Sequence, residues 1–287
     1  MMRSWLFAPA NHPRRMDKAL ALGADVSVLD LEDACPEAEK EAARDMAREA
    51  LTKPRRGLAY VRINALSSGR AEGDLQALVG MGLDGVMLPK AERRADLVAA
   101  DELIHLLERR RGLVEGEIDL VPLIETAAGV AGIAAIAGSC RRVRRFAFGS
   151  VDFALDLGLR PGHEEMELLP YRAALVLAAK VGGIEPPIDS ATLTIDDEGA
   201  AAEAALRSRA MGFQGKLCIH PNQVAATNAA FTPGDAERAR AARIVEAFEA
   251  AEARGSAAIK VDGELVDYPV FRRAKQVLAS AASTDGR

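Results

Sequence analysis

Charged side chains stand directly after several short apolar runs of this 287-residue sequence. The run VPLI leads straight into Glu125, and VSVL is followed by the acidic segment DLED, which holds Asp30, Glu32 and Asp33. A carboxylate at the end of a buried strand requires a compensating cation, so Glu125 is better explained by function than by structure. For the three acids of the DLED segment, capping the next helix and a functional role are equally open.

Two cations follow other apolar runs, Arg62 in YVRIN and Lys90 in LPKAE. Four or more carboxylates at one site repel one another unless these cations and a metal ion compensate their charge. Oxygen ligands without a matching His or Cys cluster favour a hard cation, so we expect Mg²⁺, with Mn²⁺ as a substitute, rather than zinc. The planar guanidinium of Arg62 can also bind a substrate carboxylate through two hydrogen bonds. Lys90 could have a functional role or could equally be a solvated surface charge.

Asp152 and Asp156 follow a further apolar run, within FGSVDFALDLG, and are spaced to lie on one face of a helix. Asp152 is nearer the strand, so we expect it to bind the metal and Asp156 to act as a cap or an ion-pair partner. Glycines in TAAG and FGS allow backbone N–H groups to approach an oxyanion. His220 precedes Pro221 in CIHP, which favours a role in orienting a loop over acid–base chemistry.

A repeated β-α pattern would bring these side chains together. Runs rich in Val, Ile, Leu and Phe alternate with Ala-, Arg- and Glu-rich segments of helical period, which predicts eight β-α units around a buried parallel sheet. We expect strands at residues 5–8, 26–31, 59–63, 85–88, 120–124, 145–148, 187–190 and 216–219. We expect helices at residues 14–22, 37–51, 74–81, 95–110, 171–181 and 199–211. The predicted fold is an α/β (β/α)8 TIM barrel with a C-terminal helical extension, and such barrels place their chemistry at the carboxyl ends of the strands.

The barrel is expected to span residues 1–231 and the extension residues 232–287. Within the extension we expect a helix at 232–253, then the turn-prone segment VDGELVDYP and a last helix at 270–279. A segment beyond a closed barrel must pack on its own barrel or on a neighbour. An arm of this kind can therefore reach across a subunit interface.

Composition excludes several classes of protein. Apolar residues make up 49% of the chain and charged residues 28%, which supports a large core and argues against disorder. The net charge of −5 gives no general attraction to nucleic acid or anionic lipid, and no apolar stretch suits a signal peptide or a membrane span. Three widely spaced cysteines favour core packing in a reducing cytoplasm over disulfides or zinc.

Ordered motifs along nearly the whole chain resemble a known family. They are RSWLFAPAN, KALALGADVSVLDLEDA, YVRIN, GVMLPKAE, LIETAAGV, FGSVDFALDLG and GFQGKLCIHPNQV. Together they resemble the citrate lyase β-subunit-like CoA lyases of the HpcH/HpaI aldolase/citrate lyase family, relatives of the malyl-CoA and citramalyl-CoA lyases. The resemblance implies a Mg²⁺-dependent lyase that makes or breaks a carbon–carbon bond between a short acyl-CoA and a 2-oxo acid.

The resemblance also implies roles for single residues. Glu125 and Asp152 match the family's Mg²⁺ ligands, and Arg62 matches the residue that binds the oxo-acid carboxylate. Asp267, in VDGELVDYP, matches an acid–base residue supplied to a neighbouring subunit's active site, which implies a homotrimer or hexamer. From composition alone Asp267 is only an exposed turn residue.

Further contacts with the CoA thioester and the oxo acid are expected at the barrel mouth, from Glu32, Asp33 and Lys90. The chain has no Gly-rich P-loop for the CoA phosphates. The candidates for that task are the basic residues Arg14, Arg15 and Lys18, which a charged helix face explains equally well.

Other functions are compatible with the same site. A malyl-CoA-type thioesterase would keep the fold and the metal and let water attack the thioester. A carrier-dependent citrate lyase β-like subunit would work only with partner chains, and the extension that carries Asp267 argues against it. An HpaI-type class II aldolase would lack the DLEDA and VDGELVD segments.

Overall fold

The computed structural model describes residues 1–285. It divides into two compact units, one from Met2 to Thr227 and the other from Asn228 onward, and the division falls within helix α10 (Asn222–Phe231). Each unit is described by itself.

The first unit is a closed barrel of eight parallel strands. They are β1 (Ser4–Pro9), β2 (Val26–Asp30), β3 (Leu58–Arg62), β4 (Gly85–Leu88), β5 (Asp119–Ile124), β6 (Ala147–Phe148), β7 (Ile188–Asp189) and β8 (Gly215–Cys218). Trp5 of β1 pairs with Val26 on one side and with Leu217 on the other, so the first and last strands close the ring. The predicted (β/α)8 fold is confirmed, with β6 and β7 shortened to two residues each.

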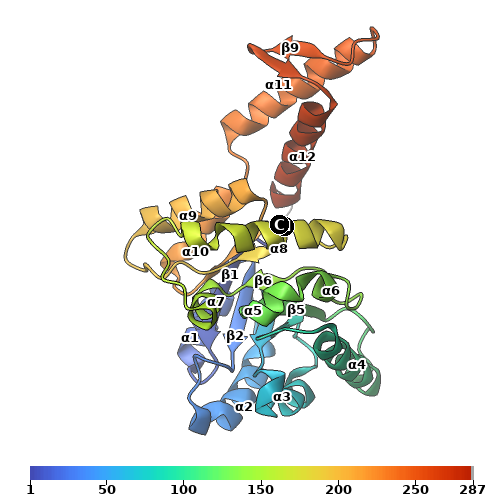
Figure 1. Ribbon diagram of the computed structural model, residues 1–287. Coiled ribbons are helices and arrows are strands. Elements are labelled where there is room, and N and C mark those ends of the chain that lie inside the picture. The colour runs from blue at the N-terminus through green and yellow to red at the C-terminus, as the bar shows by residue number, and fades with distance from the viewer. Residues whose placement is uncertain (286–287) are drawn as a thin grey trace. The chain divides into compact units, whose positions relative to one another are not determined.

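Helices surround the strands (Figure 1). Those expected from the sequence are α1 (Pro13–Ala21), α2 (Lys40–Leu51), α3 (Ala71–Leu78), α4 (Arg94–Arg111), α8 (Leu169–Val181) and α9 (Glu198–Met211). The 3₁₀ turns are η1 (Glu37–Glu39), η2 (Leu66–Ser68) and η3 (Met166–Leu168). The expected helix at 37–51 therefore begins as a 3₁₀ turn. The expected helix at 74–81 lies three residues earlier, because the backbone becomes extended at Val79, just before Gly80 and Gly82.

Further helices follow the later strands: α5 (Ala127–Ala131), α6 (Ile133–Ala137), α7 (Ser150–Leu157) and α10. The first two are short and rich in Ala, with glycine inside α5 and on both sides of α6, so their sequence carries little helical period. The Thr126 side chain caps α5 by accepting a hydrogen bond from the Gly129 amide at 3.0 Å.

The barrel interior is filled by side chains. Its buried residues are Trp5, Val26, Val28, Tyr60, Met87, Val121, Leu123, Ala147, Ile188 and Leu217. Trp5 packs edge-on against Tyr60, with ring centroids 4.9 Å apart. A Cβ on Gly85 would lie 2.1 Å from the Tyr60 ring, so glycine at this position leaves room for the ring. A hydrophobic cluster therefore fills the interior of the barrel.

The second unit pairs two helices with a hairpin. It contains α11 (Asp235–Glu252), β9 (Ile259–Val261), β10 (Glu264–Val266) and α12 (Tyr268–Asp285), and α11 and α12 lie side by side in Figure 1. The turn-prone stretch proves to be an antiparallel hairpin, in which Val261 pairs with Glu264 across Asp262 and Gly263. Both turn residues have positive φ, 50° and 89°, as a two-residue Asp-Gly hairpin turn requires.

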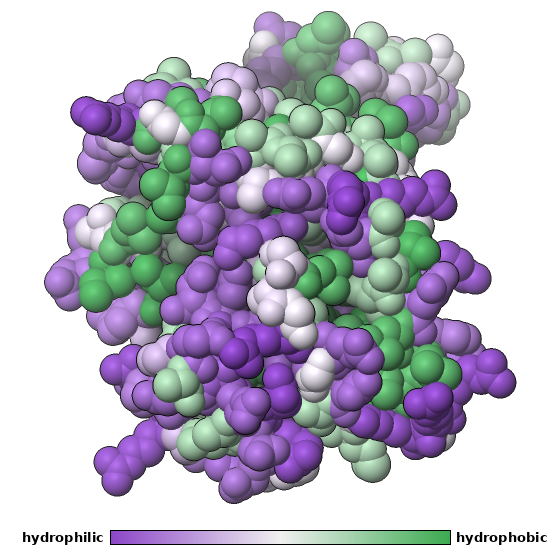
Figure 2. All heavy atoms as spheres, turned by 60° about the horizontal axis from the view of Figure 1, so that its bottom comes forward, coloured by the Kyte–Doolittle hydropathy of each residue, from purple (hydrophilic) through white to green (hydrophobic). Residues whose placement is uncertain are grey.

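The surface is mainly polar on the face shown in Figure 2, where hydrophobic residues gather in separate patches. Among the described residues, no helix combines the length and the apolar character needed to cross a membrane.

Candidate functional site

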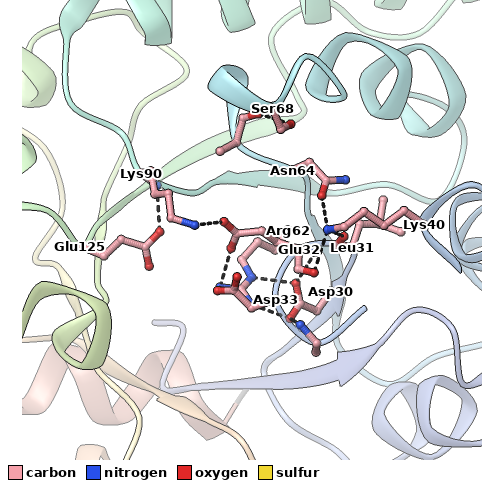
Figure 3. A network of polar contacts seen from close by, with 12 residues as sticks. Asp30, Leu31, Glu32, Asp33, Lys40, Arg62, Asn64, Ser68, Lys90 and Glu125 are labelled. Atoms are coloured by element: carbon pink, nitrogen blue, oxygen red, sulfur yellow. Dashed lines mark hydrogen bonds and ion pairs between the residues drawn. The ribbon is translucent and has the colours of Figure 1, made fainter. Parts of the chain in front are cut away.

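The acidic DLED segment and Arg62 form one hydrogen-bonded group at the carboxyl ends of β2 and β3 (Figure 3). Asp30 accepts hydrogen bonds from the backbone amides of Glu32 at 2.9 Å and Ala34 at 3.3 Å, which fixes the turn after β2. Its carboxylate also accepts from Arg62 Nε at 2.7 Å and Nη2 at 2.6 Å. Asp30 therefore stabilises the turn after β2 and also binds the Arg62 guanidinium through a bidentate hydrogen bond.

Glu32 links Arg62 to Lys90. Its Oε2 lies 2.9 Å from Arg62 Nη1, and its Oε1 accepts a hydrogen bond from Lys90 Nζ at 2.6 Å. Burial raises the pKa of Glu32, although both cations oppose the shift. Burial likewise disfavours the charged form of Arg62, but Asp30 and Glu32 outweigh it and raise the pKa of the guanidinium. The expected charge compensation by Arg62 and Lys90 is thus present.

Glu125 follows β5 and is 1% exposed. Its Oε1 accepts a hydrogen bond from the Lys90 amide at 2.8 Å, in a backbone that has the unusual φ of 50° at Lys90. Its Oε2 is buried and has no hydrogen-bond partner among the described residues. Burial and the negative charge of Glu32 raise the pKa of Glu125 to about 8, despite the opposing charge of Arg62. A buried carboxylate with one unpaired oxygen is a strong candidate for a cation ligand.

Gly149 and Asp152 complete the surroundings of Glu125. A Cβ on Gly149 would lie 2.6 Å from both Cβ and Oε2 of Glu125, so the carboxylate occupies the space that the glycine leaves. Asp152, on α7, lines the same cavity of about 440 Å³ as Glu125, Arg62 and Asp33. The structure therefore brings the two expected metal ligands and the expected carboxylate-binding arginine to one cavity.

These residues fit a hard divalent cation. Within residues 1–285, no group of three or more His, Cys, Asp or Glu side chains could hold a metal on its own. The cavity does offer two carboxylates, Glu125 with its unpaired Oε2 and Asp152. Mg²⁺ is usually bound by one or two carboxylates, with substrate oxygens and water at the remaining positions. Residues that could hold Mg²⁺ are therefore present.

The amides of the two glycines in TAAG and FGS form hydrogen bonds within the protein. The Gly129 amide donates to the Thr126 side chain, and the Gly149 amide donates to the Ile124 carbonyl oxygen at 2.9 Å. These two amides stabilise the loops after β5 and β6, and the expected approach of backbone N–H groups to an oxyanion stays a prediction. The alternative for Asp156 is resolved in favour of a cap, since it accepts a hydrogen bond from the Ala127 amide at 2.7 Å.

The basic residues of α1 differ in position. Arg15 and Lys18 line a second cavity, of about 330 Å³, together with His220. Arg15 also lines the larger cavity that holds Glu125, whereas Arg14 lines neither. His220 accepts a hydrogen bond from the Asn222 amide through Nδ1 at 3.3 Å, as the loop-orienting role predicted.

Asp267 belongs to the second unit, where it precedes α12. Its Oδ1 accepts a hydrogen bond from the Val270 amide at 3.2 Å, so it caps the first turn of that helix. It is half-buried rather than simply exposed, and the cap uses one of its two carboxylate oxygens.

Sequence reasoning missed two features of the site, the close contact between Gly149 and Glu125 and the burial of Lys40. The tight contact between Gly149 and Glu125 had no signal beyond a glycine at the end of a strand. Lys40 is buried beside the DLED segment, although in the sequence it looks like any other lysine of a helix.

The chain is similar to known proteins along nearly its whole length. A family model described as HpcH/HpaI aldolase/citrate lyase matches residues 3–221. The chain is 33% identical to the citrate lyase subunit beta of Leuconostoc mesenteroides subsp. cremoris, with 98% of this chain and 93% of that protein covered. It is 35% identical to the L-malyl-CoA/beta-methylmalyl-CoA lyase of Cereibacter sphaeroides (strain ATCC 17025 / ATH 2.4.3), with 97% and 94% covered.

Two solved structures are similar over nearly the whole chain. The protein CitE from Mycobacterium tuberculosis, in complex with magnesium, acetoacetate and coenzyme A, is 32% identical, with a TM-score of 0.80 and 98% of each chain covered. A citrate lyase from Burkholderia xenovorans LB400 has a TM-score of 0.87 with 99% of this chain and 93% of that chain covered. At 21% identity, that second similarity concerns the fold alone.

Proposed function

Because this chain belongs to the HpcH/HpaI aldolase/citrate lyase family, we propose that it is a Mg²⁺-dependent acyl-CoA lyase of the malyl-CoA or citramalyl-CoA type. The reaction forms or breaks a carbon–carbon bond between a short acyl-CoA and a 2-oxo acid. Two relatives that are 33% and 35% identical are a citrate lyase subunit beta and an L-malyl-CoA/beta-methylmalyl-CoA lyase. CitE from Mycobacterium tuberculosis is described in complex with magnesium, acetoacetate and coenzyme A.

The observation that carries the proposal is the unpaired Oε2 of Glu125. It is buried, it lies in the cavity that Asp152 and Arg62 also line, and burial holds the pKa of this carboxyl at about 8. Leaving such a group without a partner costs about 1–3 kcal/mol, which a bound cation would recover. Glu125 and Asp152 would hold the metal, which when bound polarises the carbonyl oxygen of the 2-oxo acid.

Arg62 would bind the carboxylate of the oxo acid. Asp30 and Glu32 hold its guanidinium through contacts of 2.6–2.9 Å. The contact with Asp33 is longer, 3.4 Å, and the Asp33 side chain is 53% exposed. A substrate carboxylate can therefore replace Asp33 without disturbing the other two pairs, and Arg62 would orient the carbonyl carbon for attack.

The thioester would extend toward α1. Arg15 lines both cavities and Lys18 the smaller one, so these two cations are the candidates for the CoA phosphates. Three free cysteines are compatible with the reducing cytoplasm in which we expect the protein to act.

A cleavage assay tests the proposal. Purified protein is given racemic malyl-CoA or citramalyl-CoA with Mg²⁺, and the oxo acid and the free CoA thiol are followed separately. We expect oxo acid without free thiol, and no reaction when the metal is chelated. Free thiol with malate or citramalate would instead identify a thioesterase. Absence of both products would favour a carrier-dependent subunit.

Asp267 is the proposed acid–base residue, supplied to the barrel of a neighbouring subunit in a homotrimer or hexamer. Mixing two inactive variants, Asp267→Ala and Arg62→Lys, tests this arrangement. If each site combines one subunit's barrel with another's extension, subunit exchange should restore up to about one quarter of the wild-type activity. Activity that stays absent in the exchanged mixture would contradict the shared site.

A further inference from the structure

Lys40 is a buried cation that the proposed reaction does not use directly. It is 9% exposed at the start of α2, and lysine is seldom buried unless its charge is partnered. Its Nζ donates to the carbonyl oxygens of Leu31 at 3.0 Å and Glu32 at 2.9 Å, and to Asn64 Oδ1 at 2.5 Å (Figure 3). An ammonium has three N–H donors, so these three acceptors satisfy it completely.

The two carbonyl groups belong to the backbone of the DLED segment. Arg62 and Lys90 hold the side chain of Glu32, whereas Lys40 holds its backbone. The segment is thus fixed from two directions. Removing the ammonium would leave the Leu31 carbonyl oxygen without this donor, whereas the Glu32 carbonyl oxygen would keep only the hydrogen bond from the Cys35 amide at 3.2 Å. The segment would then have to move to restore the lost hydrogen bonds.

The third acceptor is itself immobilised by α3. Asn64 donates from its backbone amide at 2.9 Å and from Nδ2 at 2.7 Å to Oδ2 of Asp74, which is fully buried. Asp74 Oδ1 in turn accepts a hydrogen bond from Arg44 Nε at 2.9 Å. Lys40 therefore connects the DLED segment to α2, to Asn64 in the loop after β3 and, through Asn64, to α3.

We propose that Lys40 is a positioning residue, which fixes the DLED segment so that Asp30 and Glu32 hold Arg62 in place for the oxo-acid carboxylate. The role in the reaction rests on the proposed function. Lys40 contacts neither Glu125 nor Asp152 in the described structure, so its loss should impair binding of the acid far more than binding of the metal.

Oxalate is a suitable probe, because it is a small dicarboxylate that resembles a 2-oxo acid and can bind together with a metal. Its affinity at saturating Mg²⁺, and the affinity for Mg²⁺ alone, are measured by calorimetry for the wild type and for Lys40→Met. The methionine keeps the length of the apolar stem and removes all three donors. Lys53→Met is the matched control, since Lys53 lies at the protein surface and pairs only with Asp17 in the contacts described.

We expect oxalate affinity to fall by about 30-fold in Lys40→Met, whereas Mg²⁺ affinity stays within about threefold of the wild type. Lys53→Met should change neither. If Lys40→Met does not fold, Lys40→Gln retains two donors and should show a smaller loss of the same kind. Equal losses of oxalate and Mg²⁺ affinity, or no loss of either, would overturn the proposal.

Hydrogen–deuterium exchange of ligand-free protein separates this inference from the proposed function. Backbone amides of residues 31–35 should exchange faster in Lys40→Met than in the wild type or in Lys53→Met. If wild-type protein binds no oxalate and exchange is faster, the proposed function fails while the positioning of the segment stands. Unchanged exchange would refute the positioning role whatever the oxalate result.

Discussion

Replacing Gly149 with alanine should displace Glu125 and weaken Mg²⁺ binding. The new Cβ would lie 2.6 Å from both Cβ and Oε2 of Glu125. Gly149 has φ of −102° and ψ of 77°, so positive φ is not what requires glycine here. The expected effect is therefore steric, and it acts directly on the oxygen that we assign to the metal.

The magnitude follows from the size of the overlap. Carbon atoms in contact are normally about 3.5–4.0 Å apart, so the Glu125 side chain must move by about 1 Å. A displacement of that size at a catalytic group costs about 100-fold in rate, or about 2.7 kcal/mol of transition-state stabilisation. We expect kcat/KM to fall by about this factor and the Kd for Mg²⁺ to rise by about tenfold or more.

Calorimetric titration with Mg²⁺ is the assay that does not depend on knowing the substrate. Gly138→Ala is the control, because a Cβ there meets nothing within 4 Å and the site lies on an exposed turn. Both variants gain one methyl group, and only Gly149→Ala should lose metal affinity. Mg²⁺ binding by Gly149→Ala within about twofold of the wild type would refute the reasoning.

Three further predictions concern single side chains. Glu125→Gln should abolish the rise in melting temperature that Mg²⁺ produces in the wild type; a rise of equal size would remove Glu125 from the metal site. Arg62→Lys loses the bidentate contact with Asp30. It should lower kcat/KM for malyl-CoA by about 100-fold or more and leave the Mg²⁺ affinity unchanged, and full activity would contradict the assigned role. Although burial favours the neutral acid, hydrogen bonds from Arg142 at 2.8 and 2.9 Å hold the pKa of Glu108 below its ordinary value of 4.5. A lowered pKa contributes stability above pH 4.5 that is lost as pH falls through the folded pKa. Glu108→Gln should thus lower the free energy of unfolding in urea by about 3–5 kcal/mol at pH 7, and by clearly less near pH 3; an equal loss at both pH values would contradict the assignment.

The barrel was predictable because its signals are local and repeated. Each strand is a short apolar run, and the charged residues that follow the runs necessarily share one end of a parallel sheet. Glu125, Asp152 and Arg62 were found by this rule and do line one cavity. The hairpin of the second unit also had a signal, the Asp-Gly pair at residues 262–263, which was interpreted only as a turn.

The remaining features depend on contacts between distant residues. Nothing in the sequence indicates that Asp156 accepts a hydrogen bond from the Ala127 amide, or that the amides of Gly129 and Gly149 donate hydrogen bonds within the protein. The hydrogen bonds of Lys40 to the DLED segment likewise arise only when α2 folds back on β2 and β3. Such pairings are set by the closed barrel and have no period or motif of their own.

A crystal structure of the protein grown with Mn²⁺ and oxalate would test the central claim most directly, because the anomalous signal of manganese locates the metal without assumptions. We predict one strong peak bonded to Glu125 Oε2 and Asp152, with oxalate between the metal and the Arg62 guanidinium. A peak among the acids of the DLED segment, or a cavity that holds oxalate without metal, would contradict this assignment of the site.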